Sequence, residues 1–473
     1  MKTETSKPEL PTDFQSLTWR KAGLLVLGAV VCFHAAYTPA NPGPLALLII
    51  GYVACVVQLA RLRTTRQSFY TGLLTGLLCF GPQLAFFWNI FGPAAIALWA
   101  VLALWIALFV ALSHVTLVRL GVKRAVWLIP FLWTGLEYFR SELYYLKFSW
   151  LNVGYAFAGG NQIVFSGIGV YGIGFVAAVF VCCVMAVRGA MLIYLSPFLC
   201  LFYCLTVEIR SSNLGRQQVQ IAGLQLEFPT DDQIKNGLEK VITSKTNLDL
   251  IVLSEYTLDG EPPKQLKKWC LEHQKFLIVG GKDPAPNNNF YNTAFVIGTN
   301  GEVVFKQAKR VPIQFFKDGL PAPTQKLWES PWGKIGICIC YDLSYSRVTD
   351  ELVRQGAQLL IVPTMDVVDW GQHQHELHAR IAPVRAAEYR IPIFRLASSG
   401  ISQGVTRWGA VRASGSFPGE GEMIFFDARL THFGSLPLDR YLAPVAVFVT
   451  GVFVVWLAVT SRKPRITAPQ TPA

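Results

Sequence analysis

Gly336-Ile-Cys-Ile-Cys-Tyr-Asp342 joins the end of an apolar run to a turn, and Cys340 stands where the two meet. The apolar run Leu250–Ser254 ends in the same way at Glu255, and a third apolar run ends at Lys309. Because each of these residues stands at the exit of a buried-looking strand, we expect their side chains to meet in one pocket. A thiol, a carboxylate and an ammonium supply the nucleophile, the base and the oxyanion partner that thioester chemistry needs.

Between residues 218 and 396, short runs rich in Val and Ile alternate with segments of helical periodicity. This order predicts an α/β sandwich of layered sheets and helices. No Gly-rich phosphate loop occurs in the sequence, so no nucleotide cofactor is expected. The predicted strands are Gln218–Gln225, Leu250–Leu253, Phe276–Val279, Ala294–Ile297, Lys334–Ile339, Gln358–Val362 and Ile393–Leu396, and the predicted helices are Asp231–Lys245, Pro263–Gln274, Arg347–Gln355 and His373–Tyr389.

The composition is too apolar for an ordinary soluble enzyme. Of the 473 residues, 52% are hydrophobic and 15% are charged, and the mean hydropathy is +0.37. Long apolar runs, each near the roughly 20 residues that cross a bilayer, fill most of 22–206 and return at 441–460. We therefore expect a membrane protein with eight transmembrane helices, seven before the sandwich and one after it. The expected spans are 22–38, 43–60, 68–88, 93–118, 125–140, 163–187, 189–206 and 441–460.

Positive charge predicts the orientation of these spans. Lys and Arg gather on alternate flanks, whereas the opposite flanks around 39–44 and 89–93 hold none. By the positive-inside rule, both termini are cytoplasmic and the sandwich lies outside the cytoplasm. The alternative, six or seven spans with a cytoplasmic sandwich, would place the basic tail outside. The basic flanks hold Lys2, Lys7, Arg20, Lys21, Arg61, Arg63, Arg66, Arg119, Lys123, Arg124, Arg188, Arg462, Lys463 and Arg465.

Three domains follow from this pattern. They are an N-terminal transmembrane domain (1–207), a catalytic domain (208–437), and a last helix with a basic cytoplasmic tail (438–473). The first apolar run lacks a small-residue cleavage site, so we expect it to be retained as a span. Much of the net charge of +12 lies in short loops between spans, so no binding of nucleic acid is expected.

A polar and aromatic segment follows the fifth expected span. Trp133, Glu137 and Arg140 fall at helical spacing near its end, and Trp150 follows in the next loop. One interpretation is that the charged pair and the aromatic rings anchor the helix at the membrane surface. The other is that these four residues contact an entering lipid or substrate, because ionisable groups at this depth are candidates for function.

The residues at the strand exits, taken with their neighbours, resemble the nitrilase superfamily of carbon–nitrogen hydrolases. The resemblance implies that Glu255, Lys309 and Cys340 form a Glu-Lys-Cys triad on an α-β-β-α sandwich. Cys338 is the alternative nucleophile, two residues earlier on the same strand. The matching stretches are Leu250–Gly260, Tyr291–Ala294, Lys309 and Ile339–Asp342.

With the expected spans included, the whole chain is similar to the apolipoprotein N-acyltransferase family. Three further stretches, within 133–150, 167–174 and 385–402, fit that family. The resemblance implies that the Tyr341 backbone N–H is a second oxyanion donor beside Lys309.

The chain departs from the family pattern near the triad. Ser254 stands where the family has Pro, and Asp342 stands where Glu is usual. Lys317 occupies the place of a second important Glu, and only a local shift would bring the neighbouring Asp318 into that place. These changes leave the acylation step intact and put the donor or acceptor preference in doubt.

No metal and no cofactor are expected. The run His373-Gln-His-Glu-Leu-His378 contains three histidines, but it resembles the start of a family helix rather than a metal site. Seven of the ten cysteines lie in the apolar part, where they are small buried hydrophobes, and none has zinc-site spacing.

The resemblance implies an acyltransferase of the bacterial inner membrane, with its catalytic domain on the periplasmic side. A fatty acyl chain would pass from a phospholipid, through a Cys340 thioester, to the N-terminal amino group of the diacylglyceryl-cysteine of an apolipoprotein. The alternatives are a membrane-tethered nitrilase-type amidohydrolase, an acyltransferase with a different acceptor, and a non-catalytic scaffold. Eight spans argue against a simply anchored hydrolase, and the complete triad argues against a scaffold.

Overall fold

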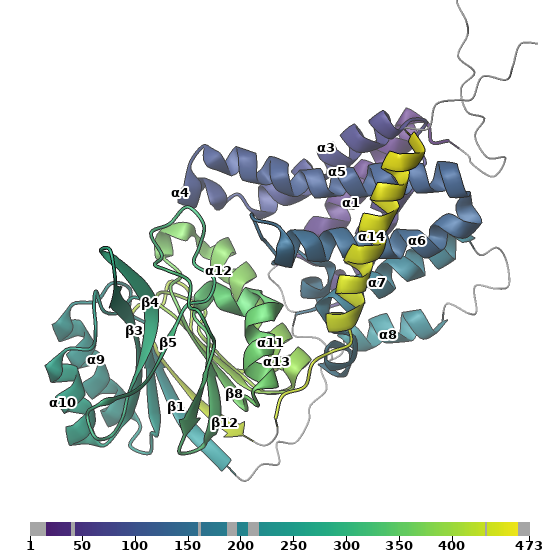
Figure 1. The fold of residues 1–473 in the computed structure, drawn as a ribbon. Coiled ribbons are helices and arrows are strands. Elements are labelled where there is room, and N and C mark those ends of the chain that lie inside the picture. The colour runs from purple at the N-terminus through teal and green to yellow at the C-terminus, as the bar shows by residue number, and fades with distance from the viewer. Residues whose placement is uncertain are drawn as a thin grey trace, which may run out of the picture.

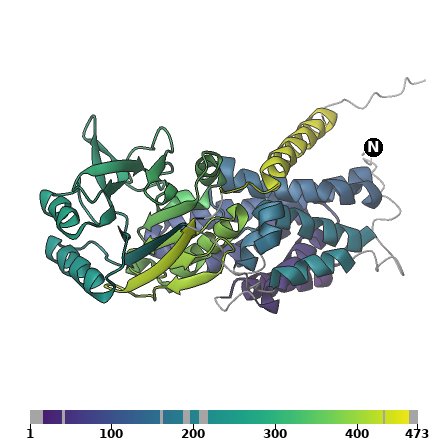
Figure 2. The same cartoon turned by 90° about the horizontal axis from the view of Figure 1, so that it is seen from below.

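The computed structural model describes residues 16–38, 43–158, 162–186, 196–206, 217–430 and 433–461. It has two parts, which Figures 1 and 2 show lying end to end. One part, here called the helical half, comprises the helices up to residue 206 and the last helix of the chain. The other part is a two-sheet sandwich formed by residues 217–430.

The described helices follow the expected spans closely. Four of them, α1, α5, α7 and α14, are long and apolar enough to cross a membrane, whereas α2 and α8 are apolar but shorter. Eight spans and their orientation therefore stay a prediction. Residues 189–195 of the seventh expected span, Lys2, Lys7, Arg188 and the basic tail lie outside the described residues. The helices are α1 (Trp19–Ala36), α2 (Leu48–Leu59), α3 (Thr65–Gln83), α4 (Phe87–Phe91), α5 (Ala94–Leu120), α6 (Val122–Tyr138), α7 (Gln162–Ala186), α8 (Ser196–Thr206) and α14 (Asp439–Ser461).

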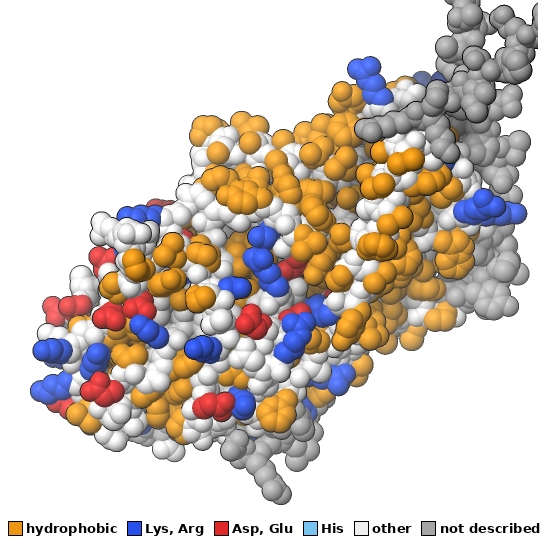
Figure 3. Space-filling view, viewed as in Figure 1, with side chains coloured by type: hydrophobic (Ala, Val, Ile, Leu, Met, Phe, Trp, Pro, Cys, Tyr) orange, Lys and Arg blue, Asp and Glu red, His pale blue; other side chains and the backbone are white. Residues whose placement is uncertain are grey.

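Large apolar side chains cover the outside of the helical half. Leu24 and Leu27 of α1, Trp127 of α6, and Phe448 and Val455 of α14 are all 60% or more exposed. Figure 3 shows this apolar surface over the helical half, while Lys, Arg, Asp and Glu gather over the sandwich. An apolar surface of this extent is costly in water and is typical of helices that face lipid.

The sandwich consists of two six-stranded sheets. In the first, β1, β2 and β3 are parallel neighbours; in the second, β7, β8 and β9 are. The orders are β12-β1-β2-β3-β4-β5 and β11-β10-β9-β8-β7-β6. The strands are β1 (Gln217–Leu224), β2 (Leu250–Leu253), β3 (Phe276–Ala285), β4 (Asn289–Ile297), β5 (Val303–Ala308), β6 (Leu327–Ser330), β7 (Gly333–Ile337), β8 (Leu359–Thr364), β9 (Ile393–Ala397), β10 (Gln403–Val405), β11 (Val411–Ser414) and β12 (Met423–Leu430).

Helices cover both outer faces of the sandwich, as predicted. Leu238 and Trp269, from α9 and α10, are buried in one apolar cluster with the first sheet, while α11, α12 and α13 lie between the second sheet and the helical half (Figure 1). The helix predicted over His373–Tyr389 is instead two helices that meet at Arg380. Pro383 stands in the first turn of the second, where its missing N–H costs nothing, whereas inside one long helix it would break a hydrogen bond. These helices are α9 (Asp231–Ser244), α10 (Lys264–His273), α11 (Ser346–Arg354), α12 (Gln372–Ala379) and α13 (Ile381–Tyr389).

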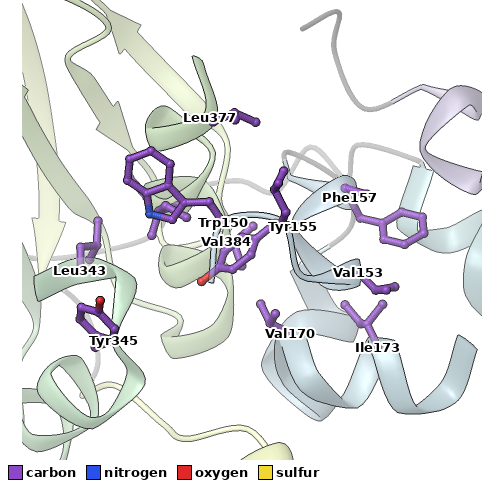
Figure 4. Close-up of a cluster of buried hydrophobic side chains, with 14 of the residues drawn as sticks. Trp150, Val153, Tyr155, Phe157, Val170, Ile173, Leu343, Tyr345, Leu377 and Val384 are labelled. Atoms are coloured by element: carbon purple, nitrogen blue, oxygen red, sulfur yellow. The ribbon is translucent and has the colours of Figure 1, made fainter. Parts of the chain in front are cut away.

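The two parts share a continuous buried core. Figure 4 shows Trp150 and Tyr155, from the segment after α6, in one buried cluster with the sandwich residues Leu377 and Val384 and with Val170 and Ile173 of α7. Trp150 Nε1 donates to Ser344 Oγ at 2.9 Å. The segment 148–157 therefore holds the sandwich against the helices.

A buried ion cluster reinforces this junction. Arg440 at the start of α14 pairs with Asp350 at 2.9 Å, Glu388 at 3.2 Å and Asp439 at 2.7 Å. Glu388 also accepts the Val170 N–H at 2.8 Å, where Gly169 interrupts α7 with a φ of 71°. One guanidinium thus links residues from the helical half to residues from the sandwich.

Candidate active site

Cys340 lies at the end of the second sheet, where β7 gives way to a short 3-10 turn, Cys340–Ser344. Its φ of 51° is a left-handed backbone conformation that non-glycine residues rarely adopt and that is often found at functional turns. The thiol is buried and donates to the Met365 carbonyl oxygen at 3.8 Å. Burial, together with the nearby Glu255 carboxylate, raises the pKa of Cys340 well above its usual value, so a thiolate needs an adjacent base.

Glu255 and Lys309 form a buried pair beside this thiol. Lys309 Nζ donates to Glu255 Oε1 at 2.9 Å, and Asn292 Nδ2 donates to the same oxygen at 2.6 Å. The Met365 N–H donates to Glu255 Oε2 at 2.8 Å, so the Glu255 carboxylate and the Cys340 thiol contact the same residue. The structure therefore brings the three predicted strand-exit residues together.

Asp318 supplies a second carboxylate to the lysine. Its Oδ2 lies 2.8 Å from Lys309 Nζ, and its Oδ1 accepts from Tyr256 Oη at 2.7 Å and Asn292 Nδ2 at 2.8 Å. Lys317, in contrast, is exposed. The carboxylate expected near the lysine is thus present one residue later in the chain.

These contacts shift the pKa values of the two carboxyl groups, Glu255 and Asp318, in opposite directions. Burial opposes the charge of Lys309, but Asp318 and Glu255 outweigh it and hold the pKa of Lys309 well above its usual value. Burial also opposes the charge of Asp318, yet Lys309 outweighs it and lowers the pKa of Asp318. The pKa of Glu255 is raised, first by burial and further by Asp318, although Lys309 opposes this. A carboxylate with a raised pKa is suited to accept a proton from a thiol.

Asp342 fixes the turn that carries the thiol. Its carboxylate accepts backbone N–H groups of Ile339 at 3.2 Å, Arg310 at 3.0 Å and Val311 at 2.7 Å. Burial raises the pKa of Asp342 to about 6, and the N–H donors and Lys309 oppose the shift. Asp342 therefore ties the nucleophile turn to the residues that follow Lys309.

A cavity of about 830 Å³, counted to its open mouth, leads away from Cys340. Its lining includes Tyr341, whose hydroxyl donates to the Lys147 carbonyl oxygen at 2.9 Å. The remaining wall is mainly apolar and comes mostly from the helical half and the loop after Lys309. The apolar and aromatic part of that wall consists of Phe86, Phe87, Ile90, Phe91, Leu98, Val101, Leu102, Leu146, Phe148, Trp150, Ile313, Phe315, Phe316 and Trp370, and the polar part consists of Lys147, Gln314, Asp366, Gln374 and His378.

The four membrane-side candidates separate in the structure. Trp150 lines the cavity of Cys340, whereas Trp133, Glu137 and Arg140 line a different cavity within the helical half. Glu137 Oε1 accepts the Val153 N–H at 3.0 Å, so Glu137 anchors the following loop, while anchoring of the helix at the membrane surface and contact with an entering lipid both stay predictions.

Sequence reasoning gave no role to two sets of buried polar residues at the site. Asn292 bridges Glu255 and Asp318, and the family-like stretch 291–294 was the signal that marked it. His378 also lines the cavity, with Nδ1 2.8 Å from Asp366 Oδ1, and Arg395 pairs with the same carboxylate. Within the described residues, no cluster of three or more His, Cys, Asp or Glu side chains could hold a metal ion.

Comparison with known proteins assigns the chain to a family. The family model of the carbon–nitrogen hydrolases matches residues 185–413, and that of the apolipoprotein N-acyltransferase N-terminal domain matches residues 29–183. The sandwich therefore makes the chain a member of the nitrilase superfamily. The N-terminal match places it, more particularly, in the apolipoprotein N-acyltransferase family, whose members act in lipoprotein N-acylation at the membrane.

Curated relatives agree with this assignment. Apolipoprotein N-acyltransferase of Shewanella oneidensis is 23% identical, and that of Geobacter metallireducens 24%; each alignment covers 85% of this chain, and 90% and 88% of the relatives. An omega-amidase of Xenopus laevis is 25% identical over 34% of this chain and 64% of its own length. Among solved structures, Saccharomyces cerevisiae Nit3 matches 55% of this chain and 100% of its own, with 20% identity and a TM-score of 0.39.

Proposed function

We propose that this enzyme moves a fatty acyl chain from a membrane phospholipid to the N-terminal amino group of the diacylglyceryl-cysteine of an apolipoprotein, through a thioester on Cys340. The cavity that joins the Cys340 thiol to apolar side chains of α4 and α5 carries this proposal. An acyl chain in this cavity stays out of water, whose contact would cost about 0.8 kcal/mol per CH₂ group, whereas a water-soluble amide substrate has no need of such a wall.

In the first half-reaction, Glu255 removes the Cys340 proton, and the thiolate attacks the ester carbonyl carbon of the phospholipid. The negative charge that develops on the carbonyl oxygen is stabilised by Lys309 and by the Tyr341 backbone N–H. One such donor is typically worth about 3 to 4 kcal/mol. When the tetrahedral intermediate collapses, Glu255 returns the proton to the leaving oxygen, so a lysophospholipid departs and a thioester remains.

In the second half-reaction, the neutral amino group of the acceptor attacks the thioester carbonyl. The same two donors hold the oxyanion, and the carbon–sulfur bond breaks. The amine loses one proton and the Cys340 thiolate regains one, so the enzyme returns to its starting state with an amide formed. No cofactor takes part in this exchange.

We also propose the predicted membrane arrangement for this chemistry. Both termini are cytoplasmic, and the sandwich lies on the periplasmic side of the bacterial inner membrane, supported by the basic flanks and by the apolar surface of the helical half. Both lipid substrates then reach the cavity from the bilayer without passing through water.

Hydrolysis is the competing function, because an omega-amidase is 25% identical to this chain over 34% of its length. The test is the intact mass of a model diacylated lipopeptide after incubation with membranes that contain this chain or its Cys340→Ala variant. A gain of one fatty acyl mass that depends on Cys340 supports the transferase. An acylated Cys340 without transfer indicates a different acceptor. The absence of both the acylated lipopeptide and the acylated Cys340 indicates a hydrolase or a scaffold.

A further inference from the structure

The helical half contains a second cavity, of about 380 Å³ counted to its mouth. It lies between α3, α5 and α6, and the loop after α6 closes one side. Polar side chains of Trp105, Trp133, Glu137 and Arg140 line it, among the rings of Phe80 and Phe109. Charged groups in an otherwise apolar bundle are costly, so their exposure to a common cavity needs a reason.

Each of these four residues leaves one buried polar atom without a hydrogen-bond partner among the described residues. The atoms are Trp105 Nε1, Trp133 Nε1, Glu137 Oε2 and Arg140 Nη1. The two charged residues are only half used by the fold, since Glu137 Oε1 accepts the Val153 N–H and Arg140 Nη2 donates to Asn152 Oδ1 at 2.5 Å. Further unpaired buried polar atoms occur among the described residues, but four that surround one cavity point to a bound group that completes them.

Gly174 of α7 keeps this place open. A Cβ atom at that position would stand 2.9 Å from Glu137 Oε2 and 3.5 Å from Trp133 Nε1. A side chain there would therefore fill the space beside two of the unpaired atoms.

The second cavity and the cavity of Cys340 lie along the same helix, α5. Leu98, Val101 and Leu102 of α5 line the first, and Trp105, Ile106 and Phe109 of the same helix line the second. These positions follow one another on consecutive helical turns, which rise by about 5.4 Å each. A lipid whose polar end occupies the second cavity is therefore close to the reaction site.

We propose that the second cavity binds the polar end of a lipid that carries an ammonium group together with acceptor oxygens. An anion alone would meet the Glu137 carboxylate, and a cation alone would meet Arg140. A group with both charges satisfies the three N–H donors with its oxygens, and its ammonium donates to Glu137 Oε2 among aromatic rings. Two lipids carry this chemistry: a phospholipid with an amine head group, and the S-diacylglyceryl-cysteine terminus of the acceptor. The choice of these two lipids rests on the proposed function, whereas the binding of a zwitterionic lipid in the second cavity does not.

The test measures lipid binding to the full-length Cys340→Ala protein in detergent by native mass spectrometry, so no turnover is needed. We expect a phospholipid with an ethanolamine head group to bind about tenfold more tightly than one with a glycerol head group, as one charge-assisted hydrogen bond allows. Glu137→Gln keeps the acceptor for Val153 and removes the charge, so it should abolish this preference. Trp133→Phe keeps the ring and should weaken both lipids.

Trp99→Phe is the matched control, because Trp99 Nε1 is already paired with the Leu84 carbonyl oxygen at 2.9 Å outside this cavity. It should leave both affinities unchanged. Binding of a diacylated lipopeptide with a free or an acetylated N-terminus separates the two sources. If acetylation weakens binding to the protein with Glu137 but not to the Glu137→Gln variant, the site binds the acceptor. Equal binding of every lipid to wild type, Glu137→Gln and Trp133→Phe would overturn the proposal and leave the cavity to water. Loss of acyl transfer with the lipid preference intact would instead refute the proposed function alone.

Discussion

Asp318→Asn is the most informative change at the candidate active site, because the side chain keeps its size and loses its charge. Asp318 accepts from Lys309 at 2.8 Å, Tyr256 at 2.7 Å, Asn292 at 2.8 Å and the Ile313 N–H at 2.8 Å. An amide offers one acceptor oxygen and turns its NH₂ group toward the remaining donors. Either orientation of the amide therefore leaves buried donors facing each other.

The size of the effect follows from the geometry. Two unit charges 2.8 Å apart attract by about 6 kcal/mol at an effective dielectric constant near 20, before desolvation is counted. Breaking one partner of a buried pair costs about 3 to 5 kcal/mol in measured cases. We expect the thermal midpoint of the purified protein to fall by roughly 10 °C. Asp318→Asn keeps the oxyanion donor Lys309 but removes one of the two carboxylates that position it, so acyl-enzyme formation should slow by up to about 10² to 10³, the factor that loss of such a donor costs.

The pH profile separates this mechanism from simple loss of structure. Asp318 contributes to the raised pKa of Glu255, so removing its charge lowers that pKa. Acyl-enzyme formation needs ionised Glu255, and its acidic limb should therefore move to lower pH even though the plateau rate falls. The assay is single-turnover acylation by a phospholipid in mixed micelles, measured across the pH range with rapid quenching.

Asp283→Asn provides the control for this experiment. Asp283 pairs with Lys306 at 2.6 Å in the same sheet, but the lysine side chain is 53% exposed. An exposed pair of this kind contributes about 0 to 1 kcal/mol, so both the midpoint and the pH profile should stay close to wild type. An acidic limb of Asp318→Asn that stays in place, or moves to higher pH, would refute the assignment of Glu255 as the base.

Three further changes test other parts of the structure. The thermal midpoint of Asp342→Asn should rise relative to that of wild type as the pH increases from about 4 to about 6. The reason is that burial raises the pKa of the Asp342 carboxyl to about 6, so folded wild type loses stability over this range and the variant does not; thermal unfolding at several pH values checks this. Arg440→Met leaves three carboxylates without their shared cation and should cost about 3 to 5 kcal/mol, whereas loss of the exposed Lys268 pair should cost less than about 1 kcal/mol, as thermal midpoints will show. Leu98→Trp narrows the cavity of Cys340 and should shift the acyl-enzyme toward shorter chains, measured by intact mass; Leu104→Trp, on the exposed side of α5, should not.

Local pattern was enough to predict the main parts of the molecule. The strand runs and most helices were confirmed within a few residues, because side-chain period and turn residues act over short stretches of chain. Four strands were missed: β6, β10, β11 and β12. Little signal marks β10, which has three residues, and β11, which has no buried position, but β12 alternates buried with more exposed positions over eight residues and was missed despite that signal. Glu255, Lys309 and Cys340 were readable as strand exits for the same reason, but their meeting was not: Glu255 and Lys309 follow strands of the first sheet and Cys340 follows a strand of the second, so the packing of the two sheets brings them together.

The sequence did not show which of the four aromatic and charged residues after the fifth expected span line the same cavity. Trp133, Glu137, Arg140 and Trp150 looked like one group, yet the loop after α6 divides them between two cavities. Which side of a loop a residue faces depends on what packs against it, and here the partners come from α5, α7 and the sandwich.

The sequence alone determined that an α/β sandwich with a thiol, a carboxylate and an ammonium is attached to apolar helices, because hydrophobic period and residue type are local properties, and the resemblance of short motifs added that the sandwich is nitrilase-like. Only the tertiary structure decided that Asp318, rather than the residue at 317, reaches Lys309. Gly319 has a φ of 80° and packs against the Phe290 carbonyl oxygen, where a Cβ atom would come within 2.8 Å. This turn directs the Asp318 side chain inward, and a one-residue choice of that kind is fixed by contacts between distant segments.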